Sequence, residues 1–241
     1  MKTIGVIPAR YKSSRFPGKP LAKIRDKPMI WWVYNQSKKV EEFDEVFVAT
    51  DDKRIKNKCK ELGIEVIMTS EKHPTGSDRV AEVADKVDAD LYVNIQGDEP
   101  LIAPRTIKAA INPFSQEQSL SVTNLMTEIN SQSEIIDSNV PKVVVNDNNI
   151  GVFLSRSPIP YPKGANENYY KQVCVYGFTK EALKFYKESD RGKVEKIEDI
   201  EILRFIENDY KVKFIEVEQD TIGVDNKKDL KMVREIMQKR G

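Results

Sequence analysis

Arg10, Arg15 and Lys19 are three of the cations on one short segment that directly follows the apolar run 4–7. Such a run is typical of a buried strand. In a fold of parallel strands and helices, ligands bind beyond the carboxyl ends of the strands, so this segment would deliver all three cations to one crevice. Three positive charges on one loop suit a triphosphate. The alternative interpretation is a solvated basic turn.

Two carboxylates complete the candidate chemistry. Asp98 follows the apolar run 91–95, and Asp225 follows Gly223 just before the last expected helix, 227–239. An acidic side chain that faces cations is explained by Mg²⁺, a hard cation that bridges carboxylate and phosphate oxygens. The alternative for Asp225 is that it only caps the N-terminus of the last helix.

Strand and helix signals alternate through the first hundred residues. Short apolar runs predict strands, and apolar residues at helical spacing predict the helices between them. This order predicts an α/β fold with a doubly wound, mostly parallel sheet. The expected strands are 4–7, 45–49, 65–68 and 91–95, the expected helices 29–40, 52–62 and 78–87, and later a core strand 173–178 and helices 199–208 and 227–239.

The strongest hairpin signal in the chain is the pair of β runs on either side of the Asn/Asp turn 146–149. We expect this ribbon, 142–154, to leave the core as a small antiparallel lobe of about residues 120–165. A lone hairpin is marginally stable in water, so it needs a partner surface, and a second subunit is a natural candidate. Otherwise we expect a single domain over residues 1–241.

Composition excludes several classes of function. The chain has 241 residues, and its 39 Lys and Arg nearly balance its 38 Asp and Glu. No global field therefore favours nucleic acid or an anionic membrane, and any anion site must be local. No apolar stretch approaches the roughly 20 residues that span a bilayer, and the N-terminus has no leader pattern, so we expect a cytoplasmic protein.

The sulfur and imidazole groups suggest no chemistry of their own. Cys59 and Cys174 lack metal-ligand spacing, so we interpret both as free thiols. His73 is the only histidine. A Ser/His/Asp site would need a nucleophile and an orienting carboxylate that nothing in the sequence identifies, so we interpret His73 as structural or as lining a nucleotide.

Several motifs follow one another along nearly the whole chain: Ile7–Tyr11, Ser13, Arg15, Pro17–Leu21, Ala49–Asp51, His73, Gly76–Arg79, Gln96–Pro100, Ser155–Pro160 and Gly223–Asp225. In this order they resemble the 3-deoxy-manno-octulosonate cytidylyltransferases, the CMP-Kdo synthetase family. The resemblance implies a nucleotide-diphospho-sugar transferase-like fold and a homodimer built partly through the hairpin lobe. It implies transfer of CMP from CTP to the anomeric hydroxyl of Kdo with release of pyrophosphate, Mg²⁺ as cofactor, and a role in lipopolysaccharide or capsule synthesis.

The resemblance also implies roles for individual residues. The catalytic residues would be Lys19, Arg10 and Asp98, and the metal ligands Asp98 and Asp225. The residues that would bind CTP are Pro8, Ala9, Arg10, Ser13, Arg15, Lys19, Thr75, Gly76, Ser77, Arg79 and Gln96. Those that would contact the sugar acid are Gln96, Arg156, Gln172, Tyr176, Glu198, Glu201, Ile202 and Arg204.

The sequence departs from the family pattern at two of the expected sugar contacts. Gln172 stands where the family commonly has His, and Ile202 replaces a polar Gln. A site built to hydrogen-bond a hydroxyl discriminates strongly when that bond is lost, so the acceptor could be a different acid. Candidates are an amino-substituted Kdo, another ulosonic acid, a sialic acid-like acid or a phosphonate. Neutral drift within a Kdo enzyme is the other interpretation, because water can replace a side-chain contact.

Two rival functions stay open. The first is a non-catalytic nucleotide-binding homologue, because a fold alone does not establish turnover. Intact Arg10, Lys19, Asp98 and Asp225 favour catalysis. The second is a CMP-sialic acid synthetase, and the opening Pro8–Tyr11 argues against it, as does the later motif Gln96–Pro100.

Overall fold

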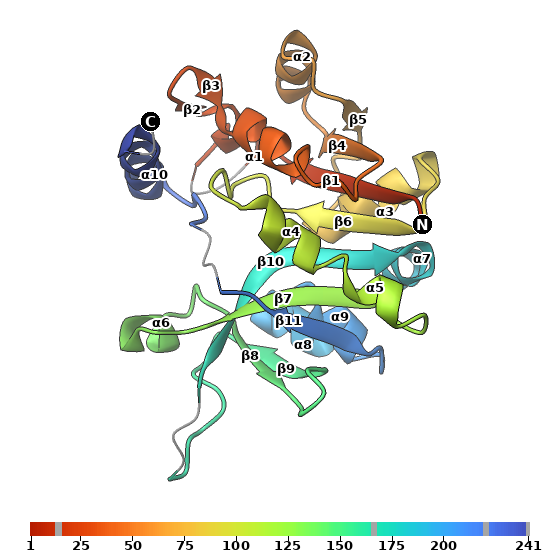
Figure 1. Cartoon of the computed structure of the whole chain (residues 1–241), viewed down its shortest axis with the longest axis vertical. Coiled ribbons are helices and arrows are strands. Elements are labelled where there is room, and N and C mark those ends of the chain that lie inside the picture. The colour runs from red at the N-terminus through yellow and green to blue at the C-terminus, as the bar shows by residue number, and fades with distance from the viewer. Residues whose placement is uncertain (13–15, 165–167, 219–221, 240–241) are drawn as a thin grey trace. The chain divides into compact units, whose positions relative to one another are not determined.

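The computed structural model describes residues 1–12, 16–164, 168–218 and 222–239 (Figure 1). Two compact units make up the chain. Unit 1 comprises Met1–Lys108 and Thr221–Gly241, and unit 2 comprises Ala109–Asp220. Sequence analysis predicted a single domain over 1–241, and that arrangement stays a prediction. In the described part of the chain, no helix is long and apolar enough to cross a membrane.

Unit 1 is built on a parallel sheet. Its strands are β1 (Thr3–Ala9), β4 (Glu45–Thr50), β5 (Val66–Met68) and β6 (Leu91–Ile95), in the spatial order β6-β1-β4-β5. β1 pairs in parallel with β4 on one side and β6 on the other, through Ile4 opposite Glu45 and Thr3 opposite Leu91. The strands are nearly continuous apolar runs, as expected when both faces of a parallel sheet are covered. The predicted parallel α/β fold is confirmed.

The helices of unit 1 begin at recognisable caps. They are α1 (Met29–Ser37), α2 (Lys53–Glu61), α3 (Gly76–Lys86), α4 (Pro104–Ala109) and α10 (Lys227–Lys239), with the short turn η1 (Lys19–Leu21) and the hairpin β2 (Lys23–Ile24) and β3 (Lys27–Pro28). Asp52 caps α2 by accepting a hydrogen bond from Arg54 N. Thr75 and Asp78 form a capping box, which starts α3 two residues before its predicted beginning.

Unit 2 is built around an antiparallel pair. Its sheet has β7 (Val122–Glu128) between β10 (Tyr170–Thr179), which is antiparallel to it, and β11 (Val212–Glu216), which is parallel. The predicted hairpin is present as β8 (Lys142–Val145) and β9 (Gly151–Ser155). It leaves the main path of the sheet and is attached by a short pairing of β8 with β10. Figure 1 shows this ribbon in green.

The helices of unit 2 are short, and one prediction fails here. They are α5 (Pro113–Gln116), α6 (Gln132–Ile136), α7 (Lys180–Glu188), α8 (Lys193–Glu198) and α9 (Leu203–Ile206). The predicted continuous helix 199–208 is wrong. Asp199 has a left-handed φ of 51°, which ends α8, and the chain returns to a helix only at Leu203. The carbonyl of Asp199 accepts a hydrogen bond from Arg156, a residue far away in sequence, so local spacing could not reveal the break.

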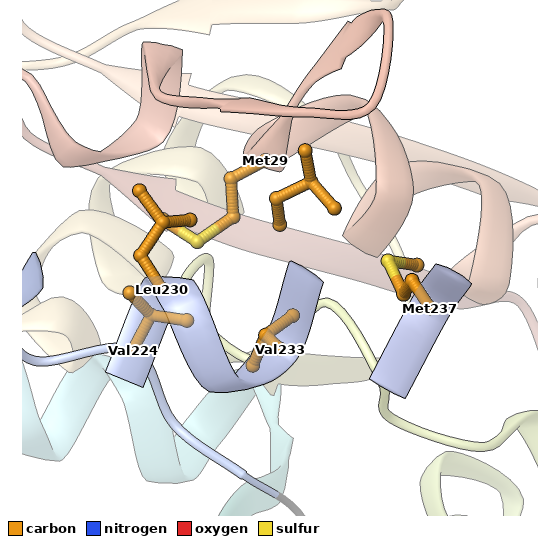
Figure 2. Close-up of a cluster of buried hydrophobic side chains, with 6 residues drawn as sticks. Met29, Val224, Leu230, Val233 and Met237 are labelled. Atoms are coloured by element: carbon orange, nitrogen blue, oxygen red, sulfur yellow. The ribbon is translucent and has the colours of Figure 1, made fainter. Parts of the chain in front are cut away.

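The last helix, α10, belongs to unit 1 because its apolar face packs against the beginning of the chain. Figure 2 shows the buried cluster, and α10 contributes three of its members, Leu230, Val233 and Met237. The remaining members are Ile24, Met29 and Val224. The backbone of Val224, in the segment that precedes α10, is thereby held in place.

Both cysteines are free thiols, as predicted. Cys59 lies on the inner face of α2, and burial raises the pKa of its thiol to about 12. A thiol with this pKa is almost entirely protonated at neutral pH, and the protonated form is a poor nucleophile. Cys59 is therefore a packing residue.

Replacing Leu230 by Ala should destabilise the protein by about 2–5 kcal/mol, because it leaves a cavity between α10 and the hairpin β2–β3. Met232→Ala on the same helix is the matched control, since Leu230 is 5% exposed and Met232 is 44% exposed. Urea unfolding of both variants measures the difference. Equal losses of stability would show that the cluster does not hold α10 in place.

Candidate active site

Lys19, Asp98 and Asp225 meet in unit 1, although they come from three distant parts of the chain. The Lys19 ammonium lies 2.5 Å from Asp98 Oδ2 and 3.6 Å from Asp225 Oδ1. The three side chains are only partly exposed. The Lys19 ammonium therefore faces two carboxylates.

The position of Lys19 is set by a tight turn before it. Gly18 has a left-handed φ of 73°, and its N–H donates to Tyr11 O at 2.9 Å. A Cβ on Gly18 would lie 3.0 Å from the Tyr11 ring, so both the backbone conformation and the space require glycine. On Tyr11 the guanidinium of Arg54 stacks 3.3 Å from the ring centroid, in cation–π contact. The hydrogen bond from Gly18 to Tyr11 and the stacking of Arg54 therefore fix the turn next to Lys19.

The two carboxylates are fixed by the backbone that carries them. Val224 N donates to Asp98 O at 2.9 Å, which joins the segment after β6 to the segment before α10. Asp225 N donates to Asp229 Oδ2 at 2.9 Å. The interpretation of Asp225 as the cap of α10 is wrong, because the side chain of Asn226 accepts from the N–H groups of Lys228 and Asp229. The Asp225 carboxylate is instead directed at Lys19.

Gly97 is required by a close backbone approach. A Cβ at this position would lie 2.8 Å from Pro8 O, a distance that side chains do not tolerate. The segment that carries Asp98 therefore lies directly on the end of β1. Of the other residues predicted to bind CTP there, Ala9 is buried, Pro8 and Gln96 are half-buried, and Arg10 is exposed. Ser13 and Arg15 lie outside the described residues.

The N-terminus of α3 lies beside the end of β1. A Cβ on Gly76 would lie 3.5 Å from Pro8 Cγ and 3.6 Å from Asn94 Nδ2, so the helix begins close to the ends of β1 and β6. The side chain of Asn94 is fully buried, and its Oδ1 has no hydrogen-bond partner in the described part of the chain. Sequence analysis missed Asn94. Its signal was a lone amide inside the apolar run 91–95.

Arg79, predicted to contact the nucleoside, is buried and makes hydrogen bonds within unit 1. It donates to Asp51 Oδ2 at 2.8 Å, to Thr69 Oγ1 at 2.8 Å and to Ser70 O at 3.1 Å. These bonds tie α3 to the ends of β4 and β5. Arg79 therefore holds the loop that leads into α3, and its contact with a nucleoside stays a prediction.

His73 belongs to the same loop and pairs with a carboxylate of α3. Its Nε2 lies 2.5 Å from Glu82 Oε2, an oxygen that also accepts from Ser70 N at 2.7 Å. The other oxygen, Oε1, accepts from Lys86 at 2.6 Å. Burial alone would raise the pKa of Glu82, but these hydrogen bonds outweigh it and lower the pKa to about 2. His73 contributes to a structural anchor, in line with the structural interpretation.

In unit 2, the residues predicted to contact the sugar divide into two groups. Glu198 accepts from Ser155 Oγ at 2.6 Å and from Arg156 N at 2.9 Å. Arg156 in turn donates to the carbonyls of Glu198, Ser138 and Asp199. These two residues and the half-buried Gln172 and Glu201 form the first group, which retains some exposure.

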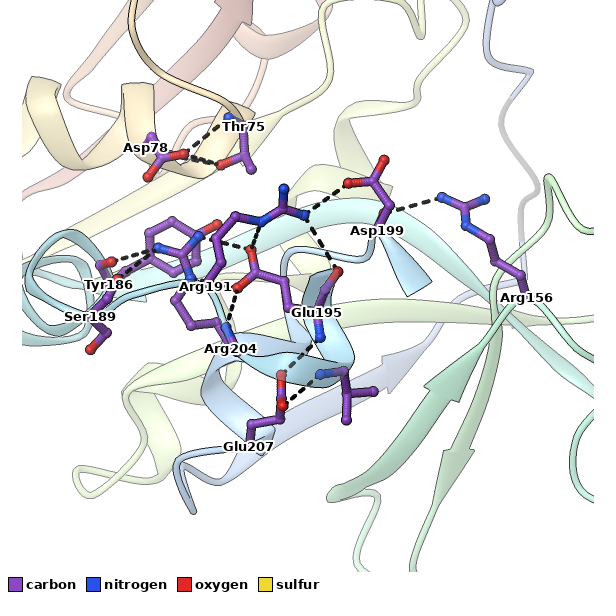
Figure 3. A network of polar contacts seen from close by, with 12 residues as sticks. Thr75, Asp78, Arg156, Tyr186, Ser189, Arg191, Glu195, Asp199, Arg204 and Glu207 are labelled. Carbon is purple, nitrogen blue, oxygen red and sulfur yellow. Dashed lines mark hydrogen bonds and ion pairs between the residues drawn. The ribbon is translucent and has the colours of Figure 1, made fainter. Parts of the chain in front are cut away.

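The second group is buried in the core of unit 2. Ile202 is 1% exposed, Tyr176 and Arg204 are also buried, and burial raises the pKa of Tyr176 well above its usual value of 10. Arg204 makes two 2.8 Å bonds to the fully buried carboxylate of Glu195 and stacks on Tyr186 (Figure 3). These side chains belong to the core of unit 2. Their contact with a sugar stays a prediction.

Gln172 has a definite partner on the neighbouring strand. Its Nε2 donates to Asn124 Oδ1 at 2.8 Å. Asn124 Nδ2 donates to Val173 O and Val175 O, both at 2.9 Å, where the register of β10 against β7 shifts. The amide of Asn124 is therefore oriented by the bulge, and it orients Gln172 in turn. Asn124 was another residue that sequence analysis missed, because its partners lie about 50 residues away.

Comparison with known proteins decides the family. A family model described as Cytidylyltransferase matches residues 4–216. The chain is 41% identical over 235 residues to the 3-deoxy-manno-octulosonate cytidylyltransferase of Fusobacterium nucleatum, covering 97% of this chain and 96% of that one. It is 40% identical over 237 residues to the enzyme of the same name from Escherichia coli, covering 98% and 96%. This chain belongs to the 3-deoxy-manno-octulosonate cytidylyltransferase family.

Solved structures agree with the family. A CMP:2-keto-3-deoxy-manno-octonic acid synthetase solved in complex with CTP has a TM-score of 0.96 and 40% sequence identity, with 100% of both chains covered. A 4-diphosphocytidyl-2C-methyl-D-erythritol synthase from Anaerococcus prevotii has a TM-score of 0.64 at 15% identity, covering 98% of this chain and 99% of that one. The second likeness shows the fold alone. The predicted cytidylyltransferase family is confirmed, and the chain is a CTP-dependent nucleotidyltransferase.

Glu82 should make the stability of the folded cytidylyltransferase depend on pH. Because its pKa in the folded protein, about 2, is below its ordinary value of 4.5, its contribution to stability is present above pH 4.5 and is lost as the pH falls towards 2. Glu82→Gln should therefore lower the free energy of unfolding at pH 7 by roughly 1–3 kcal/mol, and by much less at pH 3.

Urea unfolding at the two pH values measures this loss. Glu61→Gln, which changes an exposed carboxylate on α2, is the control and should have little effect at either pH. A Glu82→Gln penalty of the same size at pH 7 and pH 3 would contradict the assigned cause.

Proposed function

We propose that this protein transfers CMP from CTP to the anomeric hydroxyl of 3-deoxy-manno-octulosonate (Kdo), or of a closely related 2-keto-3-deoxy sugar acid, and releases pyrophosphate. The observation that carries the proposal is the full-length match to the synthetase solved with CTP, at a TM-score of 0.96. The gathering of Lys19, Asp98 and Asp225 in unit 1 supports it, because phosphoryl chemistry needs cations and carboxylates together.

The reaction is a displacement at the α-phosphorus of CTP. The anomeric oxygen of the acid forms a bond to this phosphorus and gives up its proton, while the bond from phosphorus to the bridging oxygen of the β-phosphate breaks. Catalysis of such a transfer is mostly alignment and neutralisation of charge, so no nucleophilic side chain is required. Lys19 and Arg10 neutralise and orient the phosphates in this proposal, together with Ser13 and Arg15.

The residues present fit a magnesium ion. Asp98 and Asp225 offer hard carboxylate oxygens that face a common point, now marked by the Lys19 ammonium. No group of three or more His, Cys, Asp or Glu side chains with metal-binding geometry occurs among the described residues. Mg²⁺ is usually held by one or two carboxylates, with water and phosphate oxygens as its other ligands. A bound Mg²⁺ would neutralise charge on the triphosphate.

We assign the nucleoside of CTP to the end of β1 and the start of α3. The residues concerned are Pro8, Ala9, Thr75, Gly76, Ser77, Arg79 and Gln96. The close approach of Gly76 to Pro8 supports this assignment, since it leaves the N-terminus of α3 beside the end of β1.

The sugar acid is assigned to the less buried group in unit 2, with Gln172 as the residue that sets acceptor preference. Arg156, Glu198 and Glu201 accompany it, and Tyr176, Ile202 and Arg204 support them from the core. Gln96 completes the predicted set. A glutamine in place of the family's histidine still offers hydrogen bonds, so Kdo itself is the first acceptor to test.

We further propose a homodimer formed partly through the hairpin lobe, in the cytoplasm. Support comes from β9, whose Val152 is 54% exposed and is followed by the exposed Phe153. Successive side chains of a strand point to opposite faces, so each face of this ribbon exposes an apolar side chain, as is typical of a surface that another chain covers.

The experiment that tests the function is pyrophosphate release from CTP in the presence of Mg²⁺ and a panel of 2-keto-3-deoxy acids. We expect release with Kdo or a close relative. Release with none of the acids would favour a nucleotide-binding homologue without turnover.

Asp98→Ala should lower the rate of pyrophosphate release by about 100-fold or more while leaving the fold intact, because Asp98 is assigned to the metal and not to the core. Thermal melting checks the fold. Asp26→Ala, which removes an exposed carboxylate in the same unit, is the control and should retain activity. An Asp98→Ala enzyme with normal turnover would refute the assignment.

The two departures from the family pattern should behave differently. Gln172→His should raise the ratio of kcat/KM for Kdo to that for other acids by up to about tenfold, because one hydrogen bond is worth roughly 0.5–1.5 kcal/mol.

Ile202→Gln should instead destabilise the protein by about 1–3 kcal/mol, because it buries an amide where a side chain is only 1% exposed.

The KM for CTP serves as the control for Gln172→His and should not change. For Ile202→Gln, the measurement is urea unfolding. A stable Ile202→Gln variant with an altered acceptor preference would show that this position faces the sugar after all.

A further inference from the structure

The Lys19 ammonium occupies the point that the two carboxylates share. We propose that, without nucleotide, Lys19 is the counter-ion of Asp98 and Asp225 and competes with a divalent cation for their oxygens. The cation then binds tightly only when a triphosphate draws the ammonium away. This inference rests on the metal assignment of the proposed function and adds a coupling between the metal and the nucleotide.

The first argument is that the carboxylates keep their places without Lys19. The hydrogen bond from Val224 N to Asp98 O connects their two segments, and Val224 itself is fully buried in the cluster of Figure 2. The bond from Asp225 N to Asp229 holds the other segment at the start of α10. None of these contacts involves the Lys19 side chain, so we expect Asp98 and Asp225 to keep their positions when the charge of Lys19 is removed.

The second argument is that the ammonium can leave while its backbone stays. Lys19 N donates to Phe16 O at 3.2 Å, and Ala22 N donates to Lys19 O at 3.0 Å, so the turn η1 fixes the main chain. The side chain beyond it has four rotatable bonds and ends in a point charge. Triphosphate oxygens offer this charge a partner at least as strong as a carboxylate.

The third argument is electrostatic. With the ammonium 2.5 Å from Asp98 and 3.6 Å from Asp225, a divalent cation on the same oxygens would lie within a few ångströms of a like charge. Repulsion at such distances is large where the groups are partly shielded from water. The ammonium and the divalent cation therefore cannot both lie between the two carboxylates. Binding of the nucleotide determines which of them does.

The test uses Mn²⁺ alone, with nucleotide-free protein, and measures free Mn²⁺ by electron paramagnetic resonance. We expect Lys19→Met to bind Mn²⁺ at least tenfold more tightly than the unchanged protein. Lys108→Met is the matched control, because Lys108 pairs with Glu42 elsewhere in unit 1, and its Mn²⁺ affinity should not change. Lys19→Gln provides a second uncharged side chain should Lys19→Met fail to fold.

The gain must also depend on the carboxylates. Adding Asp98→Asn to Lys19→Met should return the Mn²⁺ affinity to that of the unchanged protein or below. The inference is overturned if the uncharged variants bind Mn²⁺ no more tightly, or if the gain survives Asp98→Asn. Pyrophosphate release by the unchanged protein is a separate readout, so its absence would refute the proposed function without affecting the Mn²⁺ comparison.

Discussion

Two carboxylates that face one point repel each other unless a cation lies between them, and this constraint organises unit 1. Lys19 supplies the cation, and three segments distant in sequence must converge to bring it there. Each segment is held by something other than the ion pair itself: the Gly18 turn, the close approach of Gly97 to Pro8, and the hydrogen bond from Val224 to Asp98. The backbone therefore fixes the positions of the two carboxylates. It does not determine whether the Lys19 ammonium or a metal ion balances their charge.

The C-terminal helix is part of this scaffold although it lies far from the sheet in sequence. Leu230, Val233 and Met237 bury the apolar face of α10 against Ile24 and Met29, and this burial keeps Val224 in place. Burying large aliphatic side chains contributes about 1.5–3 kcal/mol each, well above the net contribution of one hydrogen bond. The position of Asp225 thus depends mainly on hydrophobic packing one residue away from it.

Much of this arrangement could be predicted from sequence. The carboxyl ends of parallel strands meet at one edge of a sheet, which is why Lys19 and Asp98 were expected together. The turn 146–149 likewise identified the hairpin. What could not be predicted depends on partners distant in sequence. Asp199 interrupts a helical pattern, with its carbonyl bonded to Arg156. Asn94 stood out only as a lone amide in the apolar run 91–95, and the groups that surround the buried Asn94 and Asn124 come from residues distant in sequence. Ile202 was assigned to a sugar contact by its place in a motif, whereas its burial follows from packing that a motif does not describe.

Two of the ionic groups described above differ in a way that bears on function. In unit 2, Arg204 and Glu195 are buried, form two short bonds, and are surrounded by further donors and acceptors from Arg191, Tyr186 and Ser189. Such a pair is costly to separate, because each partner would be left as an uncompensated buried charge. The group around Lys19 is partly exposed, and its ammonium is shared between two carboxylates. Exchanging its cation costs far less, since water and phosphate oxygens can solvate the ammonium as it moves. A buried pair with many further hydrogen bonds suits a permanent scaffold, whereas a partly exposed group suits a site whose charges are rearranged in every catalytic cycle.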